Sequence, residues 1–180
     1  MYNKIAITNR RLCSDLLEHI KKLDNSDYSH IILREKDLTL DEYTALAQKA
    51  VEISPKMILH YYADSCKILN YKKIHVPFYI LKKEIKKLSN FDVIGVSIHS
   101  IDEALEAETL GASYITASHI FETKCKEGLE PKGLKWLNEV CNNVNIPVYA
   151  LGGINEKNAQ SCIDNGAFGV CMMSEAMRKC

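Results

Sequence analysis

The sequence has neither paired cysteines nor an excess of charge of one sign. Its seven cysteines are scattered and include no CxxC pair, which argues against a disulfide framework and a zinc knuckle. We therefore expect reduced thiols, with Cys171 packed in the core and Cys125 in a loop. The 23 basic and 23 acidic residues balance, so no overall field favours nucleic acid or an anionic membrane surface. The balanced charge does not exclude a small neutral or anionic ligand.

Long apolar runs are also missing. No stretch approaches the length that spans a membrane, and the first residues, MYNKIAITNRRLC, show neither the basic start nor the apolar centre of a secretory signal. No linker, low-complexity tract or obvious repeat interrupts the chain. These absences predict a cytoplasmic protein with no membrane partner. The length of 180 residues is enough to bury a substantial core, so we expect a single domain over residues 1–180.

What the sequence does contain is a regular alternation of short apolar runs with helical patterns. Strands that are apolar on both faces are typical of parallel sheets covered by helices. The eight apolar runs are residues 4–9, 30–35, 57–62, 73–78, 93–99, 114–119, 147–153 and 169–174.

The segments between these runs are predicted to be helices. Ser14 and Ser100 stand at positions typical of N-caps, and Gly111 and Gly166 stand where helices end. A β-then-α alternation repeated eight times predicts a (β/α)₈ TIM barrel. The helices are expected over residues 14–23, 39–54, 64–71, 81–88, 100–111, 131–143 and 155–166.

Two features strain the barrel prediction, so a doubly wound open sheet stays as the alternative. The chain is shorter than the roughly 250 residues typical of such barrels. After Ser174 only EAMRKC remains, which predicts a truncated last helix. Because a short helix would leave part of the barrel wall uncovered, we expect a homodimer.

Strand ends meet at one mouth of a parallel barrel, so the residues there are the candidates for a site. Gly152 and Gly153, with Ser174 after the last strand, leave backbone N–H groups that could hold a phosphate. A tight turn that needs positive φ explains the paired glycines about equally well.

The second strand ends in LREK, which places Arg34 and Lys36 on the same side of the chain. Two cations there could hold a phosphate or a diphosphate through charge-assisted hydrogen bonds. The alternative is that one of them forms a structural ion pair with Glu35 or Asp37. Both interpretations stay open at this point.

His119 is the first candidate for proton transfer, because an imidazole both takes and gives a proton near neutral pH without a metal. The alternative is a histidine in the barrel wall that is satisfied by a backbone carbonyl, an interpretation that applies more strongly to His75 and His99. Lys126, at the far end of the same loop, could reach over a phosphate or remain solvated.

With these stretches assembled, the chain resembles the superfamily of thiamine phosphate synthase and TenI-type thiazole tautomerase. The resemblance spans nearly the whole chain and implies a (β/α)₈ barrel. It rests on IAITNR for the first strand, LREK for the second, VIGVSIHSIDEALEAETLGASYI for the fifth and sixth, and IPVYALGGI and NGAFGVCMMS for the last two.

Within this superfamily the tautomerase branch is the closer one. The synthase holds Mg²⁺ through an Asn-Asp pair that ends strand three and an Asp after strand four; this chain has His60 and Tyr61 at the first place and Ile80 or its neighbours at the second. The synthase's Gln and its Thr-x-Thr-Lys loop are replaced by Leu33 and by TKCK at 123–126. SHIFETKCKEGLEPKG is similar to the tautomerase loop, whose proton-transfer histidine corresponds to His119.

The resemblance therefore implies an isomerase, a thiazole tautomerase of thiamine biosynthesis that aromatises a thiazole carboxylate phosphate with no metal or other cofactor. One alternative is a thiamine phosphate synthase, an Mg²⁺-dependent transferase that joins a pyrimidine diphosphate to the thiazole phosphate. The other is a non-catalytic barrel that binds thiazole phosphate. The residues predicted to contact substrate are Arg34, Lys36, Ser97, Thr123, Lys126, Gly152, Gly153 and Ser174, with His119 as the catalytic residue.

Overall fold

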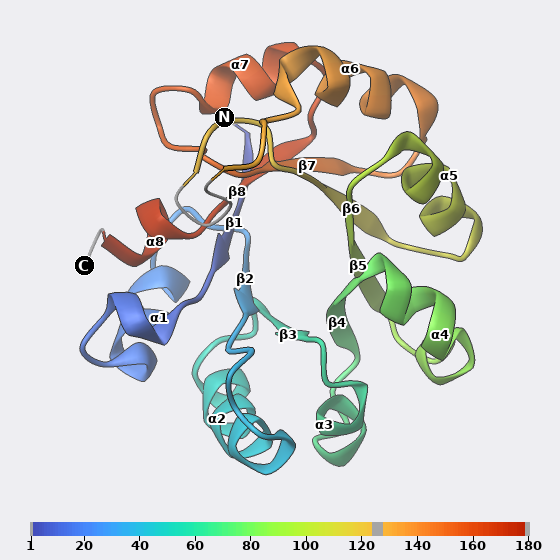
Figure 1. Ribbon diagram of the computed structural model, residues 1–180. Helices are drawn as coiled ribbons and strands as arrows, with labels where there is room; N and C mark the ends of the chain where they lie inside the picture. The colour runs from blue at the N-terminus through green and yellow to red at the C-terminus, as the bar shows by residue number, and fades with distance from the viewer. Residues whose placement is uncertain (1, 124–127, 179–180) are drawn as a thin grey trace.

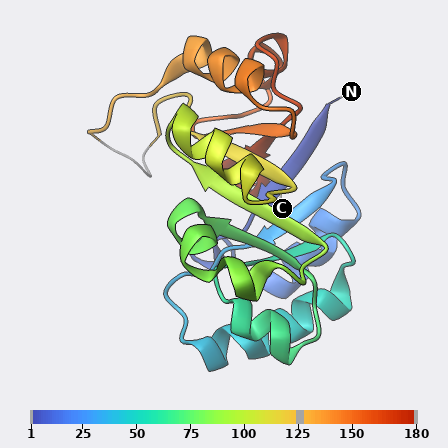
Figure 2. The same cartoon turned by 90° about the vertical axis from the view of Figure 1, so that its right-hand side faces the viewer.

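The computed structural model describes residues 2–123 and 128–178. Eight parallel strands close into a barrel in sequence order, and β8 pairs with β1 to complete it. The helices lie outside the ring of strands, as both views show (Figures 1 and 2). The (β/α)₈ prediction is confirmed, and the open-sheet alternative is wrong. The strands are β1 (Asn3–Ile7), β2 (His30–Leu33), β3 (Met57–His60), β4 (Lys73–Pro77), β5 (Val93–Ile98), β6 (Tyr114–Ser118), β7 (Val148–Leu151) and β8 (Gly169–Met172).

Each predicted helix is present, with shifted ends. Asp15 rather than Ser14 caps the first one, because the Asp15 side chain accepts the N–H of Glu18 at 3.1 Å. The fourth begins at Phe78, directly after β4, three residues earlier than predicted. The last is short, as predicted. The helices are α1 (Leu16–Asp24), α2 (Leu40–Ile53), α3 (Ala63–Ile68), α4 (Phe78–Leu88), α5 (Ile101–Thr109), α6 (Gly133–Asn143), α7 (Ala159–Asp164) and α8 (Ser174–Arg178), with a 3₁₀ turn η1 (Arg10–Leu12) after β1.

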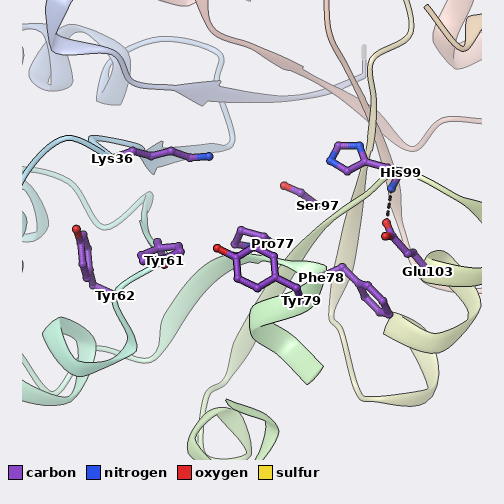
Figure 3. Close-up of a pocket in the computed structure, with 9 residues that line it drawn as sticks. All are labelled: Lys36, Tyr61, Tyr62, Pro77, Phe78, Tyr79, Ser97, His99 and Glu103. Atoms are coloured by element: carbon purple, nitrogen blue, oxygen red, sulfur yellow. Dashed lines mark hydrogen bonds between the residues drawn. The ribbon is translucent and has the colours of Figure 1, made fainter. Parts of the chain in front are cut away.

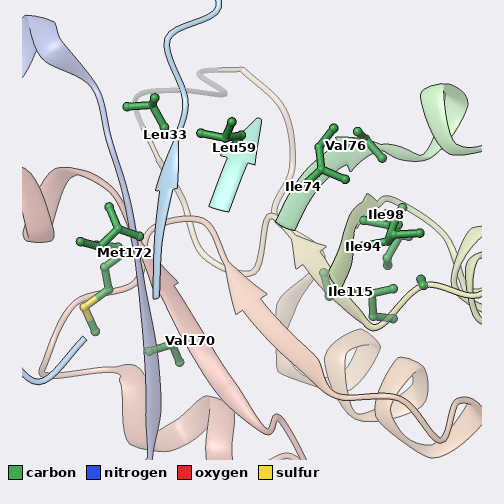
Figure 4. Close-up of a cluster of buried hydrophobic side chains, with 14 of the residues drawn as sticks. Leu33, Leu59, Ile74, Val76, Ile94, Ile98, Ile115, Val170 and Met172 are labelled. Carbon is green, nitrogen blue, oxygen red and sulfur yellow. The ribbon is translucent and has the colours of Figure 1, made fainter. Parts of the chain in front are cut away.

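Successive residues along each strand point alternately into two apolar clusters. Ile5, Ile32 and Ile58 belong to a small cluster inside the barrel, together with Cys171, whose predicted place in the core is confirmed. The larger cluster contains the strand residues of opposite parity and the inner faces of the helices; Figure 4 shows strand residues of this cluster, Leu59 among them. Side chains on both faces of the strands are therefore largely buried, and this explains why the strand sequences are continuous apolar runs. No helix in the described residues is long and apolar enough to cross a membrane.

Helix α2 starts in a capping box that makes a testable contribution to stability. The Thr39 side chain accepts the N–H of Glu42 at 3.3 Å, and the Glu42 carboxylate accepts the N–H of Thr39 at 2.9 Å. We expect Thr39→Ala to lower the free energy of unfolding by about 1 kcal/mol, because the N–H of Glu42 loses its acceptor and the Glu42 carboxylate loses the Thr39 hydroxyl, which donates to it at 2.8 Å. Urea denaturation measures this. Gln48→Ala, an exposed change in the same helix, should stay within about 0.5 kcal/mol of the parent, and an equal loss in both variants would contradict the assignment.

Candidate functional site

A cavity of about 540 Å³ opens where the carboxyl ends of the strands meet. Residues in or directly after all eight strands line it, as expected for the mouth of a parallel barrel. Lys126 and Cys125 lie outside the described residues. The other predicted site residues all line this cavity: Arg34, Lys36, Ser97, His119, Thr123, Gly152, Gly153 and Ser174.

An aromatic cleft of about 570 Å³ adjoins the cavity, and the two share Lys36, Pro77, Ser97 and His99. Figure 3 shows Lys36 extending from the end of β2 toward the side of the cleft that carries Ser97. Of the aromatic residues of this cleft, the sequence pointed only to Tyr61, at the place of a synthase metal ligand. The other three were not predicted, and neither was Arg178, which lines the main cavity from α8. The only feature of the sequence that could have identified these three aromatic residues is their position, because two of them directly follow β4. The aromatic residues are Tyr61, Tyr62, Phe78 and Tyr79.

The loop after β7 is held so that its backbone N–H groups are available to a ligand. The Asn158 side chain donates to the carbonyl of Gly153 at 2.9 Å and accepts the N–H of Asn155 at 2.8 Å. The carbonyl of Gly152 accepts the N–H of Phe121 at 3.0 Å. Within the described part of the chain, neither glycine N–H donates a hydrogen bond. Both glycines have positive φ, +104° and +69°, so the tight turn and the anion cradle are compatible.

The end of β2 separates its basic from its acidic residues. Glu35 is buried and accepts hydrogen bonds from the Thr8 hydroxyl at 2.7 Å and from the backbone N–H of Arg10 at 3.1 Å. Asp37 pairs with Arg10 at 2.6 Å, and this contact lowers the pKa of its carboxyl to about 2. The two acids thus face Arg10, while Arg34 and Lys36 line the cavity.

His75 and His60 form a buried, uncharged pair in the wall of the cavity. The two nitrogens of His75 are hydrogen-bonded to the Tyr114 hydroxyl at 3.0 Å and the Ser97 hydroxyl at 2.8 Å, so the predicted backbone-carbonyl partner is wrong for this histidine. Burial, followed by the charge of Lys36, lowers the pKa of His75 to about 3. The ring of His60 stacks on that of His75, with centroids 6.0 Å apart. Burial, followed by the neighbouring His75 and the charges of Lys36 and Arg34, lowers the pKa of His60 well below its usual value.

His99 and His119 lie beside the end of β6. The Nδ1 of His99 is 3.1 Å from the carbonyl oxygen of Ser118, as predicted for a wall histidine. His119 is buried, and its Nε2 is 3.3 Å from the carbonyl oxygen of Leu129. The carbonyl partner that was the alternative for His119 is therefore present, although the ring also lines the cavity.

A single hydroxyl braces the ends of β2 and β3 beneath the site. Tyr43 on α2 donates to the carbonyl of Leu33 at 2.8 Å and accepts the N–H of His60 at 2.7 Å. The hydroxyl thus bridges the backbones of β2 and β3 at the point where the two strands separate. In this way it positions the residues that follow both strands. Burial raises the pKa of its hydroxyl, which keeps this group neutral and able to donate.

The residues at the mouth do not fit the Mg²⁺ site that the resemblance to synthases implies. Magnesium prefers carboxylate and water oxygens. The end of β3 presents the imidazole of His60 and the phenol of Tyr61, and Asp64 lies one helical turn later with its carboxylate 3.7 Å from Lys87. Among the residues that the structure describes, no three His, Cys, Asp or Glu side chains form a group that could hold a metal ion.

Comparisons with known proteins identify the family of this chain. The sequence profile described as thiamine monophosphate synthase matches residues 5–176. The thiamine-phosphate synthase of Clostridium acetobutylicum is 34% identical over 96% of this chain and 86% of its own length. The thiamine-phosphate synthase of Clostridium tetani is 32% identical over 82% of this chain and 73% of its own length. The structure of thiamine phosphate pyrophosphorylase from Pyrococcus furiosus matches with a TM-score of 0.83 and 25% identity, over 98% of this chain and 88% of that one.

These findings correct the functional prediction. The relatives are named as synthases, which are transferases, and none of the proteins above is named a tautomerase. The prediction of a thiazole tautomerase, and with it of an isomerase, is wrong, because it weighed the missing acids and the loop at 118–133 above the similarity of the whole chain. The profile covers most of the chain, and the eight strands and the closed barrel agree with it. The chain therefore belongs to the thiamine monophosphate synthase family.

Proposed function

We propose that this protein is a thiamine phosphate synthase. In this reaction the ring nitrogen of a thiazole phosphate bonds to the methylene carbon of a pyrimidine methyl diphosphate, and the bond from that carbon to the diphosphate oxygen breaks. One observation carries the proposal beyond the names of the relatives. Two groups of residues suited to anions, Arg34 with Lys36 and Gly152 with Gly153, line the same cavity from different parts of its rim. A condensation of two phosphorylated substrates needs two such places.

Arg34 and Lys36 are assigned to the diphosphate. Negative charge grows on the bridging oxygen as the carbon–oxygen bond breaks, so cations placed there stabilise the transition state more than the bound substrate. The backbone N–H of Arg34 donates to the Thr8 hydroxyl at 3.0 Å, which fixes the chain at this point. The ion pairs of Glu35 and Asp37 with Arg10 keep these acids turned away from the anion.

Gly152, Gly153 and Ser174 are assigned to the phosphate of the thiazole. Holding both substrates in one cavity converts their encounter into a reaction within a complex, which is a large part of what a group-transfer enzyme supplies. Ser97, Thr123 and His119 line the cavity and are assigned to the substrate rings between the two anions. His119 enters this proposal as a contact residue, and its role as proton carrier falls with the tautomerase prediction.

The test is formation of thiamine phosphate from the two substrates, measured with Mg²⁺ and with EDTA. We expect product and diphosphate in equal amounts, with both substrates required. Arg34→Met should lower kcat/KM by about tenfold to a hundredfold, the usual cost of a charge-assisted hydrogen bond. Lys83→Met, an exposed change on α4, serves as the control for loss of a positive charge. Absence of thiamine phosphate under both conditions would contradict the proposal.

A non-catalytic barrel that binds thiazole phosphate is the second candidate, and the poor fit of the mouth to Mg²⁺ is the observation that favours it. It predicts tight binding of the phosphate with no product in the same assay.

The predicted homodimer and cytoplasmic location stay predictions. Leu12, on the η1 turn that packs against the short α8, is 42% exposed and is the type of residue that a dimer interface would cover. Light scattering of the purified protein measures the oligomeric state, and a monomer at all concentrations would contradict the dimer.

A further inference from the structure

We propose that this site binds the diphosphate group directly, through Arg34, Lys36 and the hydroxyl of Tyr61, without a divalent cation. The choice of ligand rests on the proposed function, but the binding itself does not require turnover. The inference starts from the disagreement between the family's metal dependence, which the resemblance implies, and the donors that this chain places at the same end of the barrel.

The carboxylates nearest to Lys36 in sequence are already engaged. Glu35 accepts from Thr8 and Arg10, and Asp37 is paired with Arg10. Across the aromatic cleft, the carboxylate of Glu103 accepts the backbone N–H of His99 at 2.6 Å, the contact marked in Figure 3. Withdrawing any of them to ligate a metal would leave a buried or capped donor unsatisfied. These carboxylates therefore serve the rim of the barrel as structural acceptors.

Hydrogen-bond donors stand where the acids would be. Tyr61 has φ of +71°, its N–H donates to the carbonyl of His75 at 3.0 Å, and its ring lies edge-on to Tyr62 with centroids 5.2 Å apart. Figure 3 shows its ring in the cleft that also contains Lys36 and Tyr79. A neutral phenol donates a hydrogen bond to a phosphate oxygen, whereas it is a poor ligand for Mg²⁺. The donor thus suits the anion and not the metal.

The field at this end of the barrel has the sign that an anion requires. Arg34 and Lys36 both act on His60, and Lys36 also acts on His75; each cation disfavours protonation of these buried rings. A divalent cation between Arg34 and Lys36 would face two charges of its own sign. A diphosphate neutralises the two cations and accepts from the phenol, so the same residues that repel the metal bind the anion.

The test is calorimetric titration of inorganic diphosphate into the full chain, once in EDTA and once in excess Mg²⁺. We expect binding in EDTA, and weaker apparent binding with Mg²⁺, because the metal competes for free diphosphate. Lys36→Met should weaken binding by about tenfold to a hundredfold, and Lys83→Met should leave it unchanged. Binding that appears only with Mg²⁺, or no binding in either buffer, would overturn the inference.

A second variant is expected to reverse the effect of Mg²⁺ on diphosphate binding. Tyr61→Asp places a carboxylate where the resemblance puts the metal ligand, and aspartate tolerates the left-handed backbone of this position better than tyrosine does. We expect weaker diphosphate binding in EDTA and recovery on addition of Mg²⁺. If Tyr61→Asp behaves like the parent in both buffers, Tyr61 does not contact the anion and the inference fails. Because inorganic diphosphate is not turned over, these outcomes are independent of whether thiamine phosphate forms.

Discussion

Gly152→Ala is expected to abolish phosphate binding at the β7 loop and to lower the free energy of unfolding by about 3 kcal/mol or more. Gly152 has φ of +104°, where a side chain is strained. An added Cβ would also lie 2.8 Å from the Cα of His119 and 3.3 Å from the backbone nitrogen of Ile120. These neighbours are held by backbone hydrogen bonds from Ile120 to Leu151 and from Phe121 to Gly152, both 3.0 Å, so they cannot give way without moving the loop.

Gly111→Ala is the matched control for this variant. Gly111 has φ of +86°, but an added Cβ would meet no atom within 4 Å. It should therefore show the cost of the backbone conformation alone, about 1 to 2 kcal/mol, with binding of thiazole phosphate unchanged. Urea denaturation and calorimetry measure the two quantities. Equal effects of both variants on stability and binding would mean that close packing of the glycine loop against the segment after β6 is unimportant.

Acid is expected to destabilise the protein strongly through His75. In the unfolded chain this histidine has a pKa near 6.5, whereas burial lowers the pKa of its side chain in the folded protein to about 3. A depressed pKa of this kind contributes stability that is fully present above pH 6.5 and is lost as the pH falls toward 3. Each pH unit inside this window costs about 1.4 kcal/mol, so the change from pH 6.5 to pH 4 should cost about 3 kcal/mol from His75 alone.

His75→Gln tests the source of this pH dependence. An amide has a donor and an acceptor for the Tyr114 and Ser97 hydroxyls, which contact His75 in the parent, but it does not titrate. We expect a shallower loss of stability between pH 6.5 and pH 4 in the variant and parallel curves between pH 7 and pH 8. The measurement is urea denaturation at each pH. Identical curves for parent and variant across the acid range would show that His75 does not carry the effect.

The prediction of function went wrong for a specific physical reason. His60 and Tyr61 argue against the metal site of a synthase, and the loop that holds His119 resembles that of a tautomerase. Local differences of this kind show which ligand a site disfavours, but they do not identify the reaction. The similarity of the chain to synthases over nearly all of its length decides the family, and the same two residues then become the basis for an inference about how the anion binds.

Periodicity predicts the eight strands and the helices between them, because each strand must bury both faces and each helix one. It favours a barrel but leaves the open sheet as an alternative, and the pairing of β8 with β1 in the tertiary structure decides between them. Position at a strand end likewise predicts that Arg34, Lys36, Gly152 and Ser174 share one mouth. The partners of the polar groups come only from the tertiary structure. The contact of His75 with Tyr114 depends on the register of β4, β5 and β6 and on Gly95, the residue between them, which has no side chain. The direction in which Glu35 faces depends on packing between β1 and β2. Such contacts join residues far apart in the chain, so no local pattern encodes them.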